Sequence, residues 1–131
     1  MTDVESTDVH LDTSFLIRAL VPGSAESGAL RRWLREGRSI AISTIVWAEF
    51  LCGPLESHVA GLARRVARTH VPLETDQAAT AALLFNETGR RRGSFQDCLV
   101  AATAIAAGAP LATIDRNDFR RFVDAGLELA E

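Results

Sequence analysis

Residues 94–119 read SFQDCLVAATAIAAGAPLATIDRNDF, and the order of helix and strand signals in this stretch decides the fold. Its first part is an almost unbroken run of apolar helix formers that ends at Gly108, which predicts a buried helix over 94–108. The proline two residues later excludes further helix. Residues 111–113 then predict a short strand, which Asp115 follows.

Two aspartates flank this helix and strand. Asp97 lies in the first turn of the predicted helix, and Asp115 lies just beyond the predicted strand. In an α/β layout the crossover helix runs antiparallel to the strands, so the helix begins at the edge where the strands end. We therefore expect both carboxylates at the same rim of the sheet.

The rest of the chain alternates strand and helix signals. Further strands are predicted at 9–12, 39–43, 70–73 and 127–129, and helices at 15–20, 25–37, 44–51 and 55–68, with another from 75 to near 89. The first helix is predicted to be capped by Thr13 and Ser14. Strands that alternate with helices indicate a parallel sheet with helices on both faces. The expected fold class is α/β, a three-layer α/β/α sandwich with a mostly parallel sheet of four to five strands.

The chain of 131 residues is long enough for one domain. Residues 1–8 are acidic and without pattern, so we expect a flexible N-terminal tail before a domain at 9–131. The strands at 70–73, which contain Pro72, and at 127–129 are expected at the edges of the sheet. The chain carries neither a membrane-length apolar run nor an N-terminal export signal, so no membrane association and a cytoplasmic location are expected.

Composition excludes several chemistries. All 14 basic residues are arginines, so neither a P-loop lysine nor Schiff-base chemistry is possible. Cys52 and Cys98 lie inside helical patterns and are interpreted as core residues rather than as a disulfide or a metal clip. The tryptophans and phenylalanines are assigned to the core in the same way. The three histidines are scattered, and none is interpreted as a ligand.

Four acidic residues form the main functional signal. Asp12 ends the first strand, Glu49 lies in the helix after the second, and Asp97 and Asp115 belong to the stretch described above. The crevice at the carboxyl ends of the strands is the usual ligand site of such a sheet. Further oxygen ligands could come from three nearby residues: Ser14, Thr113 and Asp118.

A cluster of carboxylates is unfavourable without a compensating positive charge, because two like charges ~4 Å apart repel by about 4 kcal/mol at an effective dielectric of 20. A bound cation would neutralise such a cluster. A site of oxygen ligands without histidine or cysteine is typical of Mg²⁺ or Mn²⁺ rather than zinc. The chemistry that fits is phosphodiester hydrolysis, in which the ion activates water and neutralises the charge that builds on phosphorus.

Each acidic residue also has a structural interpretation. Asp12 could cap a helix, and Asp97 and Asp115 could interact favourably with the positive N-terminal ends of helix dipoles. Glu49 is harder to explain in that way, because its apolar neighbours would leave it a buried charge without a partner. The run of three arginines at 90–92 is usually a solvated helix end, but a contact with substrate phosphate is a further possibility for these three and for one arginine outside the run. These four are Arg90, Arg91, Arg92 and Arg116.

Four motifs in order resemble the PIN domain family, and within it the VapC toxins of bacterial toxin–antitoxin pairs. They are LDTSFLI at 11–17, STIVWAEF at 43–50, DCLVAA at 97–102 and TIDRNDF at 113–119. The resemblance covers nearly the whole chain from Val9. Matched residue by residue, the four acidic residues fall on the family's acidic quartet and Thr113 on its hydroxyl position.

The resemblance implies a PIN-like endoribonuclease that depends on Mg²⁺ or Mn²⁺, forms a homodimer and is inhibited by a small antitoxin protein. The antitoxin is expected to place an arginine or lysine among the four carboxylates. A groove for an antitoxin helix could involve apolar residues of the first helices, although core burial is expected for most of them. These residues are Phe15, Leu16, Trp33 and Trp47.

Other classes fit less well. A dehalogenase-like phosphatase would place its nucleophile at Asp12, but it also needs a second aspartate where Ser14 stands, and a lysine. A receiver domain fails for the same lack of lysine. A housekeeping PIN nuclease outside a toxin pair stays open. So does a PIN module that only binds RNA or a partner, although such a module is expected to lose acidic ligands.

Overall fold

The computed structural model describes residues 8–53 and 56–131. The described strands form one parallel sheet in the order β3-β2-β1-β4. Their bounds are β1 Asp8–Leu11, β2 Ser39–Ser43, β3 Thr69–Val71 and β4 Leu111–Ala112. The strand expected at 70–73 is found at 69–71, with Pro72 just after it, and it lies at an edge of the sheet, as expected. The predicted tail lies outside the described residues except for Asp8, which begins β1.

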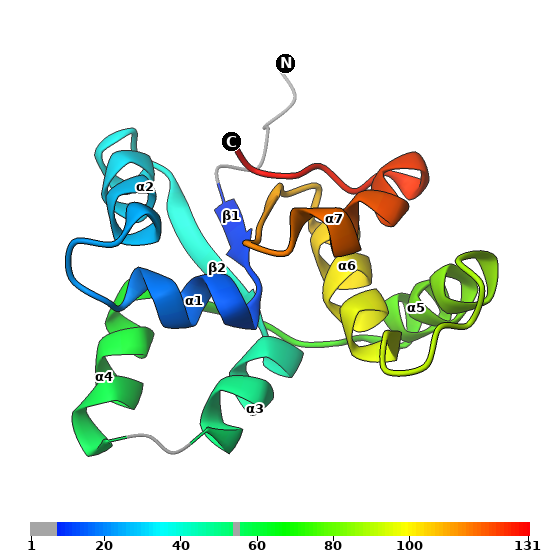
Figure 1. The fold of residues 1–131 in the computed structure, drawn as a ribbon, viewed down its shortest axis with the longest axis horizontal. Coiled ribbons are helices and arrows are strands. Elements are labelled where there is room, and N and C mark those ends of the chain that lie inside the picture. The colour runs from blue at the N-terminus through cyan, green and yellow to red at the C-terminus, as the bar shows by residue number, and fades with distance from the viewer. Residues whose placement is uncertain (1–7, 54–55) are drawn as a thin grey trace.

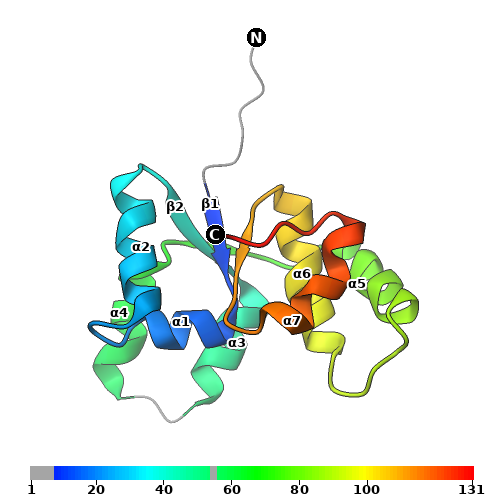
Figure 2. The ribbon, with the colours of Figure 1, turned by 45° about the horizontal axis from the view of Figure 1, so that its top comes forward.

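Helices cover both faces of this sheet. Their bounds are α1 Thr13–Ala19, α2 Ala25–Arg35, α3 Thr44–Cys52, α4 Ser57–Val66, α5 Thr75–Glu87, α6 Phe95–Ala107 and α7 Arg116–Phe119, followed by the 3₁₀ helix η1 at Arg120–Ala125. In both ribbon views α1, α2 and α4 lie on one side of β1 and β2, and α5, α6 and α7 lie on the other (Figures 1 and 2). The predicted three-layer α/β/α sandwich is confirmed, and the mostly parallel sheet of four to five strands is, among the described residues, a fully parallel sheet of four.

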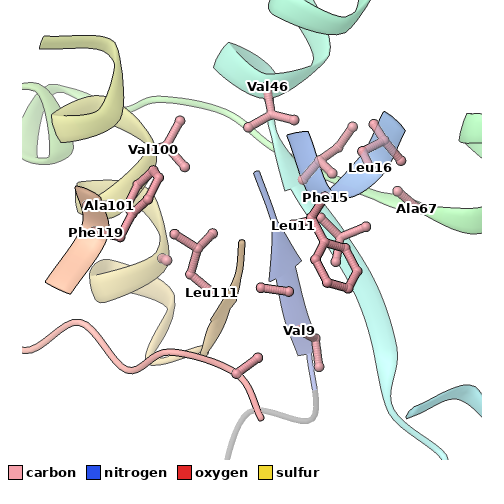
Figure 3. Close-up of a cluster of buried hydrophobic side chains, with 14 of the residues drawn as sticks. Val9, Leu11, Phe15, Leu16, Val46, Ala67, Val100, Ala101, Leu111 and Phe119 are labelled. Carbon is pink, nitrogen blue, oxygen red and sulfur yellow. The ribbon is translucent and has the colours of Figure 1, made fainter. Parts of the chain in front are cut away.

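The core fills both faces of the central strands. Val9 and Leu11 of β1 are almost fully buried. Figure 3 shows Phe15 and Leu16 on one side of β1, and Val100 and Phe119 on the other. Side chains on both faces of a sheet are buried when helices cover both faces, which explains the apolar sequence of these strands.

The stretch that predicts the fold is built as expected. The helix α6 ends at Ala107, and Gly108 adopts the left-handed conformation with φ 64°. A glycine takes up this conformation without steric cost and so ends the helix sharply. The chain then enters β4, which pairs in parallel with β1 through His10↔Leu111 and Leu11↔Ala112. This pairing brings the end of β4 beside the end of β1.

Two local predictions are corrected. The cap of α1 is Asp12 rather than Thr13 and Ser14, since the Phe15 N–H donates to Asp12 Oδ1 over 2.8 Å. Residues 127–129 do lie beside β4, but they form a single parallel bridge, Leu111↔Leu129, rather than a strand. Residues 116–125, for which no element was predicted, form α7 and η1.

Burial follows the face of a helix rather than apolar character alone. Cys98 is buried as predicted, but Cys52, the last residue of α3, is exposed. Phe95, the first residue of α6, is 44% exposed and makes an edge-to-face contact with Phe85 at 5.5 Å. Many apolar atoms remain at the surface of any folded protein, so membership of a helical pattern does not by itself predict burial.

His10 leads to a prediction about pH. It is 2% exposed in β1, and its Nε2 has no hydrogen-bond partner among the described residues. Burial lowers the pKa of His10 below 6.5, with a smaller opposing effect of Asp8. The unfolded chain therefore takes up a proton first as pH falls below about 6.5, and the free energy of unfolding drops by up to about 1.4 kcal/mol per pH unit until the folded pKa is reached. Between pH 7.5 and 5.5 the wild type should thus lose more melting temperature than His10→Leu. Equal losses in the two proteins would contradict this assignment.

Candidate active site

Asp12 stands where β1 passes into α1, and both oxygens of its carboxylate accept hydrogen bonds. Oδ1 accepts hydrogen bonds from the Phe15 N–H at 2.8 Å and the Ser14 hydroxyl at 2.9 Å, and Oδ2 accepts one from the Thr113 hydroxyl at 2.5 Å. Burial raises the pKa of Asp12, these hydrogen bonds counteract the rise, and Asp115 adds to it. Asp12 is therefore a helix cap and a member of the acidic cluster at once, so the two interpretations of this residue are compatible.

Thr113 connects two of the acidic residues. It is 5% exposed, and while its hydroxyl donates to Asp12, its oxygen accepts the backbone N–H of Asp115 at 2.9 Å. Asp115 stands at the cap position of α7, yet its side chain makes no capping hydrogen bond. The carboxylate of Asp115 is thus left available to the cavity described below.

Glu49 is not the buried charge without a partner that its apolar neighbours in the sequence predict. The residue is half-buried, and its Oε1 accepts a hydrogen bond from the Thr13 hydroxyl at 2.8 Å. In α3 the side chains of Val46 and Phe50 enter the core, whereas Glu49 reaches the edge of the cavity. Thr13 is a functional candidate that sequence reasoning missed. Its position next to Asp12 in the chain is the one signal that could have pointed to it.

The four acidic side chains surround one cavity of about 270 Å³. Its lining residues are Asp12, Thr13, Ser14, Ile17, Glu49, Asp97, Val100, Asp115 and Phe119. They come from the ends of β1 and β4 and from helices α1, α3, α6 and α7. The cavity therefore lies at the rim that the parallel strand order predicts.

Asp97 experiences the charge of this cluster most clearly. Burial raises the pKa of Asp97, Arg121 counteracts the rise, and the carboxylates of Asp118, Asp12 and Glu49 raise the pKa further. Arg121 of η1 places its Nη2 3.6 Å from Asp97 Oδ2. Nothing in the sequence pattern pointed to Arg121, because η1 was not predicted.

The remaining sequence candidates, Asp118 and the four arginines, do not line the cavity. Asp118 is exposed in the first turn of α7, near enough to act on Asp97. Arg116 donates to the carbonyl of Ala130 at 2.8 Å. Arg90 donates to Asn86 at 2.6 Å and lies over the ring of Phe85. The other two arginines of that run, Arg91 and Arg92, are exposed.

The donor set fits a hard divalent cation, although the side chains do not form a closed ligand shell. Among residues 8–53 and 56–131 no three His, Cys, Asp or Glu side chains lie close enough together to form a ready-made metal site. The cavity nevertheless presents oxygen donors, including two carboxyls, Asp12 and Asp97, whose pKa is raised by burial and by neighbouring negative charge. A cation relieves such repulsion, and oxygen ligands suit Mg²⁺ and Mn²⁺.

An apolar groove of about 540 Å³ adjoins the acidic cavity, since Ile17 and Glu49 line both. Its other lining residues are Leu20, Val21, Pro22, Phe50, Gly53, His58, Val59 and Leu62. Of the residues that sequence analysis named for an antitoxin groove, Phe15, Leu16 and Trp33 are buried and Trp47 is half-buried. The exposed apolar surface of the groove instead comes from Ile17 and Val21.

Within the described part of the chain, no helix has both the length and the apolar composition to span a bilayer.

Comparison with known proteins identifies the family. The PIN domain family matches residues 9–124. One similar structure is VapBC2 from Rickettsia felis bound to a DNA fragment from its promoter. A chain of that structure has a TM-score of 0.74 and 22% identity, and the match covers 94% of this chain and 97% of that one. A chain of FitAcB from Neisseria gonorrhoeae has a TM-score of 0.68 and 20% identity, with 94% and 96% covered.

VapC20 from Mycobacterium tuberculosis, described as a sarcin–ricin loop cleaving toxin, has a TM-score of 0.66 and 21% identity, with 93% and 98% covered. A search of curated protein sequences returns no match. At such identities the solved structures establish the fold, and the family match spans most of the chain and all four acidic residues. This protein therefore belongs to the PIN domain family.

Proposed function

We propose that the protein is a metal-dependent endoribonuclease that hydrolyses RNA phosphodiester bonds and is the toxin of a VapBC-type pair. The observation that carries the proposal is the convergence of four carboxylates, from four separate segments, on one cavity in a chain of the PIN family. Similarity to VapC20, a sarcin–ricin loop cleaving toxin, supports RNA as the substrate.

The residues that would hold Mg²⁺ or Mn²⁺ are the four carboxylates of the cavity: Asp12, Glu49, Asp97 and Asp115. When bound, the ion supplies positive charge that makes water more acidic and offsets the charge that develops on phosphorus. The hydrogen bonds that reach Asp12 from Ser14, Phe15 and Thr113 fix its orientation. The hydroxyl of Thr13 does the same for Glu49. Such positioning avoids reorganisation of the ligands during the reaction.

The RNA backbone needs positive charge near this acidic cavity. Arg116 follows Asp115 directly and Arg91 and Arg92 are exposed shortly before Asp97, so these arginines are the candidates for phosphate contacts. They would contribute to affinity through the release of counterions, and binding should weaken as salt rises.

A small antitoxin is the proposed partner. Two of the similar structures are described as a VapBC complex and as FitAB bound to DNA. In this chain the apolar groove beside Glu49 suits an amphipathic helix, and an arginine that follows such a helix could enter the acidic cavity. Toxin and antitoxin would act in the cytoplasm.

A homodimer is also proposed. A second apolar depression, of about 450 Å³, lies where α3 meets the start of α6 and is lined by Ile45, Ala48, Gly93, Phe95, Gln96 and Leu99. Phe95 in this depression is exposed. Ala48 and Gln96 directly precede the ligand candidates Glu49 and Asp97 in the chain. This apolar face is therefore a candidate dimer contact. Leu99→Asp should then convert the dimer to a monomer in sedimentation velocity, and an unchanged sedimentation coefficient would exclude this face.

Calorimetric titration of the purified protein with Mn²⁺ tests the enzymatic proposal against a module that only binds RNA. The wild type should bind the ion, and Asp97→Asn should remove or strongly weaken the binding because it replaces a carboxylate ligand by a neutral amide. Wild-type protein that binds RNA but not Mn²⁺ would favour the non-catalytic module.

The same substitution has an expected effect on stability. The pKa of Asp97 in the folded state is raised above 3.8, so the ionised form destabilises the fold at pH 7, and this penalty disappears as the pH falls through the folded pKa. Asp97→Asn should therefore raise the melting temperature of the metal-free protein, by only about 2 °C because the side chain is 38% exposed and solvent screens its charge.

Melting curves in EDTA and in Mg²⁺ measure both parts of this prediction. Added Mg²⁺ should raise the melting temperature of the wild type but not that of Asp97→Asn, because a ligand stabilises the state that binds it. A melting temperature that falls on substitution in EDTA would mean that Asp97 is a structural residue instead.

A further inference from the structure

Arg121 is a half-buried cation on the inner side of the acidic cluster. Its side chain is 15% exposed, and its Nη2 lies 3.6 Å from Asp97 Oδ2. Its guanidinium carbon lies 4.5 Å from the ring centroid of the fully buried Phe122. Phe122 in turn packs against Phe119, which lines the acidic cavity. The guanidinium is thus held between a ring and a carboxylate.

The hydrogen-bonding capacity of Arg121 is largely unused. Its Nε and Nη2 are buried and have no hydrogen-bond partner among the described residues. The 3.6 Å approach to Asp97 also exceeds the roughly 2.7–2.9 Å of a charge-assisted hydrogen bond. Buried donors without acceptors are rare and need an explanation. The contact with Asp97 is therefore electrostatic rather than a geometric clamp.

A direct contact between these donors and RNA does not fit this arrangement. Nε and Nη2 have almost no access to solvent, so a phosphate at the surface cannot reach them without a rearrangement of η1. The neighbouring Arg120 is the outward-facing residue of the pair, and its guanidinium donates to Asn117 at 2.9 Å. Arg121 acts toward the cavity through Asp97 instead.

The surroundings of Asp97 make this charge significant. Among the charged groups that act on Asp97, Asp12, Glu49 and Asp118 are negative and Arg121 is positive. A positive charge at this distance offsets part of the repulsion that the metal-free cluster would otherwise suffer. The same charge opposes the entry of a divalent cation.

We propose that Arg121 is an internal counter-ion of Asp97. The positive charge of Arg121 stabilises the metal-free cavity and weakens the affinity of the cavity for a divalent cation. The second half of the inference rests on the proposed function. Arg121 acts through its charge on Asp97 and sets the cation concentration at which the cavity fills. Replacement by an uncharged side chain should tighten Mn²⁺ binding on the order of tenfold.

The test compares Arg121→Met with Arg120→Met, which removes the adjacent exposed charge, and with Arg121→Lys, which keeps the charge. Each substitution is made in the wild type and in Asp97→Asn, and melting temperatures in EDTA and Mn²⁺ dissociation constants are measured. Arg121→Met should lower the metal-free melting temperature by roughly 5 °C in the wild type and by much less in Asp97→Asn. It should also bind Mn²⁺ more tightly, whereas Arg120→Met and Arg121→Lys should stay near the wild type in both measurements.

Equal melting shifts of Arg121→Met in the two backgrounds, or Mn²⁺ binding that is unchanged or weaker, would overturn the inference. If Arg121→Met fails to fold, folding of the double variant Asp97→Asn/Arg121→Met would support it, and failure of both would overturn it. A wild type without Mn²⁺ binding would refute the proposed function, whereas unequal melting shifts would still support the counter-ion pair.

Discussion

Asp12→Asn and Asp97→Asn should each reduce metal-dependent RNA cleavage by about 10³-fold or more while leaving the fold intact. Each substitution replaces a negatively charged oxygen of the cavity by a neutral amide of almost the same shape. At position 12 asparagine can still cap α1, because it ranks with aspartate at this helix position. The loss should therefore lie in chemistry rather than in stability.

A matched control separates charge at the cavity from charge at a helix start. Asp76 lies in the first turn of α5 as Asp97 lies in the first turn of α6, but it does not line the cavity. Asp76→Asn should cleave RNA at the wild-type rate in the same assay. Near wild-type cleavage by Asp12→Asn or Asp97→Asn, in purified and folded form, would refute the site assignment.

Expression of the wild-type protein alone should arrest bacterial growth, and co-expression with the product of the neighbouring gene should restore it. The physical reason is that the acidic cavity opens to solvent, so RNA could reach its carboxylates. Asp97→Asn should be harmless with or without the partner, because it removes the activity and not the fold. Colony counts after induction measure both effects.

The apolar groove offers a sharper version of this experiment. Val21 is 48% exposed and lines the groove but not the acidic cavity, so Val21→Asp should leave the protein toxic and prevent rescue by the partner. Leu83→Asp, which places the same charge at a residue that is 56% exposed on α5, should be rescued normally. A wild type that is harmless alone and carries no co-purifying peptide would contradict the toxin proposal and leave a housekeeping nuclease.

The parts of the fold that could be predicted from the sequence are those whose ends are marked by glycine or proline. The helix α6 could be predicted because Gly108 and the proline after it end the helix, and β4 because it follows directly. The parallel strand order then brings Asp12 and Asp115 to one rim without any knowledge of side-chain contacts. Local signals and a topological rule were sufficient for that much.

The parts that could not be predicted depend on contacts between distant segments. The hydrogen bond from Thr13 to Glu49 spans α1 and α3, and it makes Glu49 a partnered, half-buried side chain. The approach of Arg121 to Asp97 depends on η1, whose short 3₁₀ turns leave no periodic pattern in the sequence. Sequence spacing therefore identified the ligand candidates and the hydroxyls of Ser14 and Thr113 beside Asp12, but not the support from Thr13 and Arg121.

The most direct test of the central claim is cleavage of a defined RNA by the purified wild type, with analysis of the new ends. Hydrolysis by water should require added Mg²⁺ or Mn²⁺, stop in EDTA and leave no 2′,3′-cyclic phosphate ends, because the nucleophile is water and not the ribose 2′-hydroxyl. Cleavage that continues in EDTA and leaves 2′,3′-cyclic phosphate ends would contradict a metal-dependent carboxylate site at Asp12, Glu49, Asp97 and Asp115.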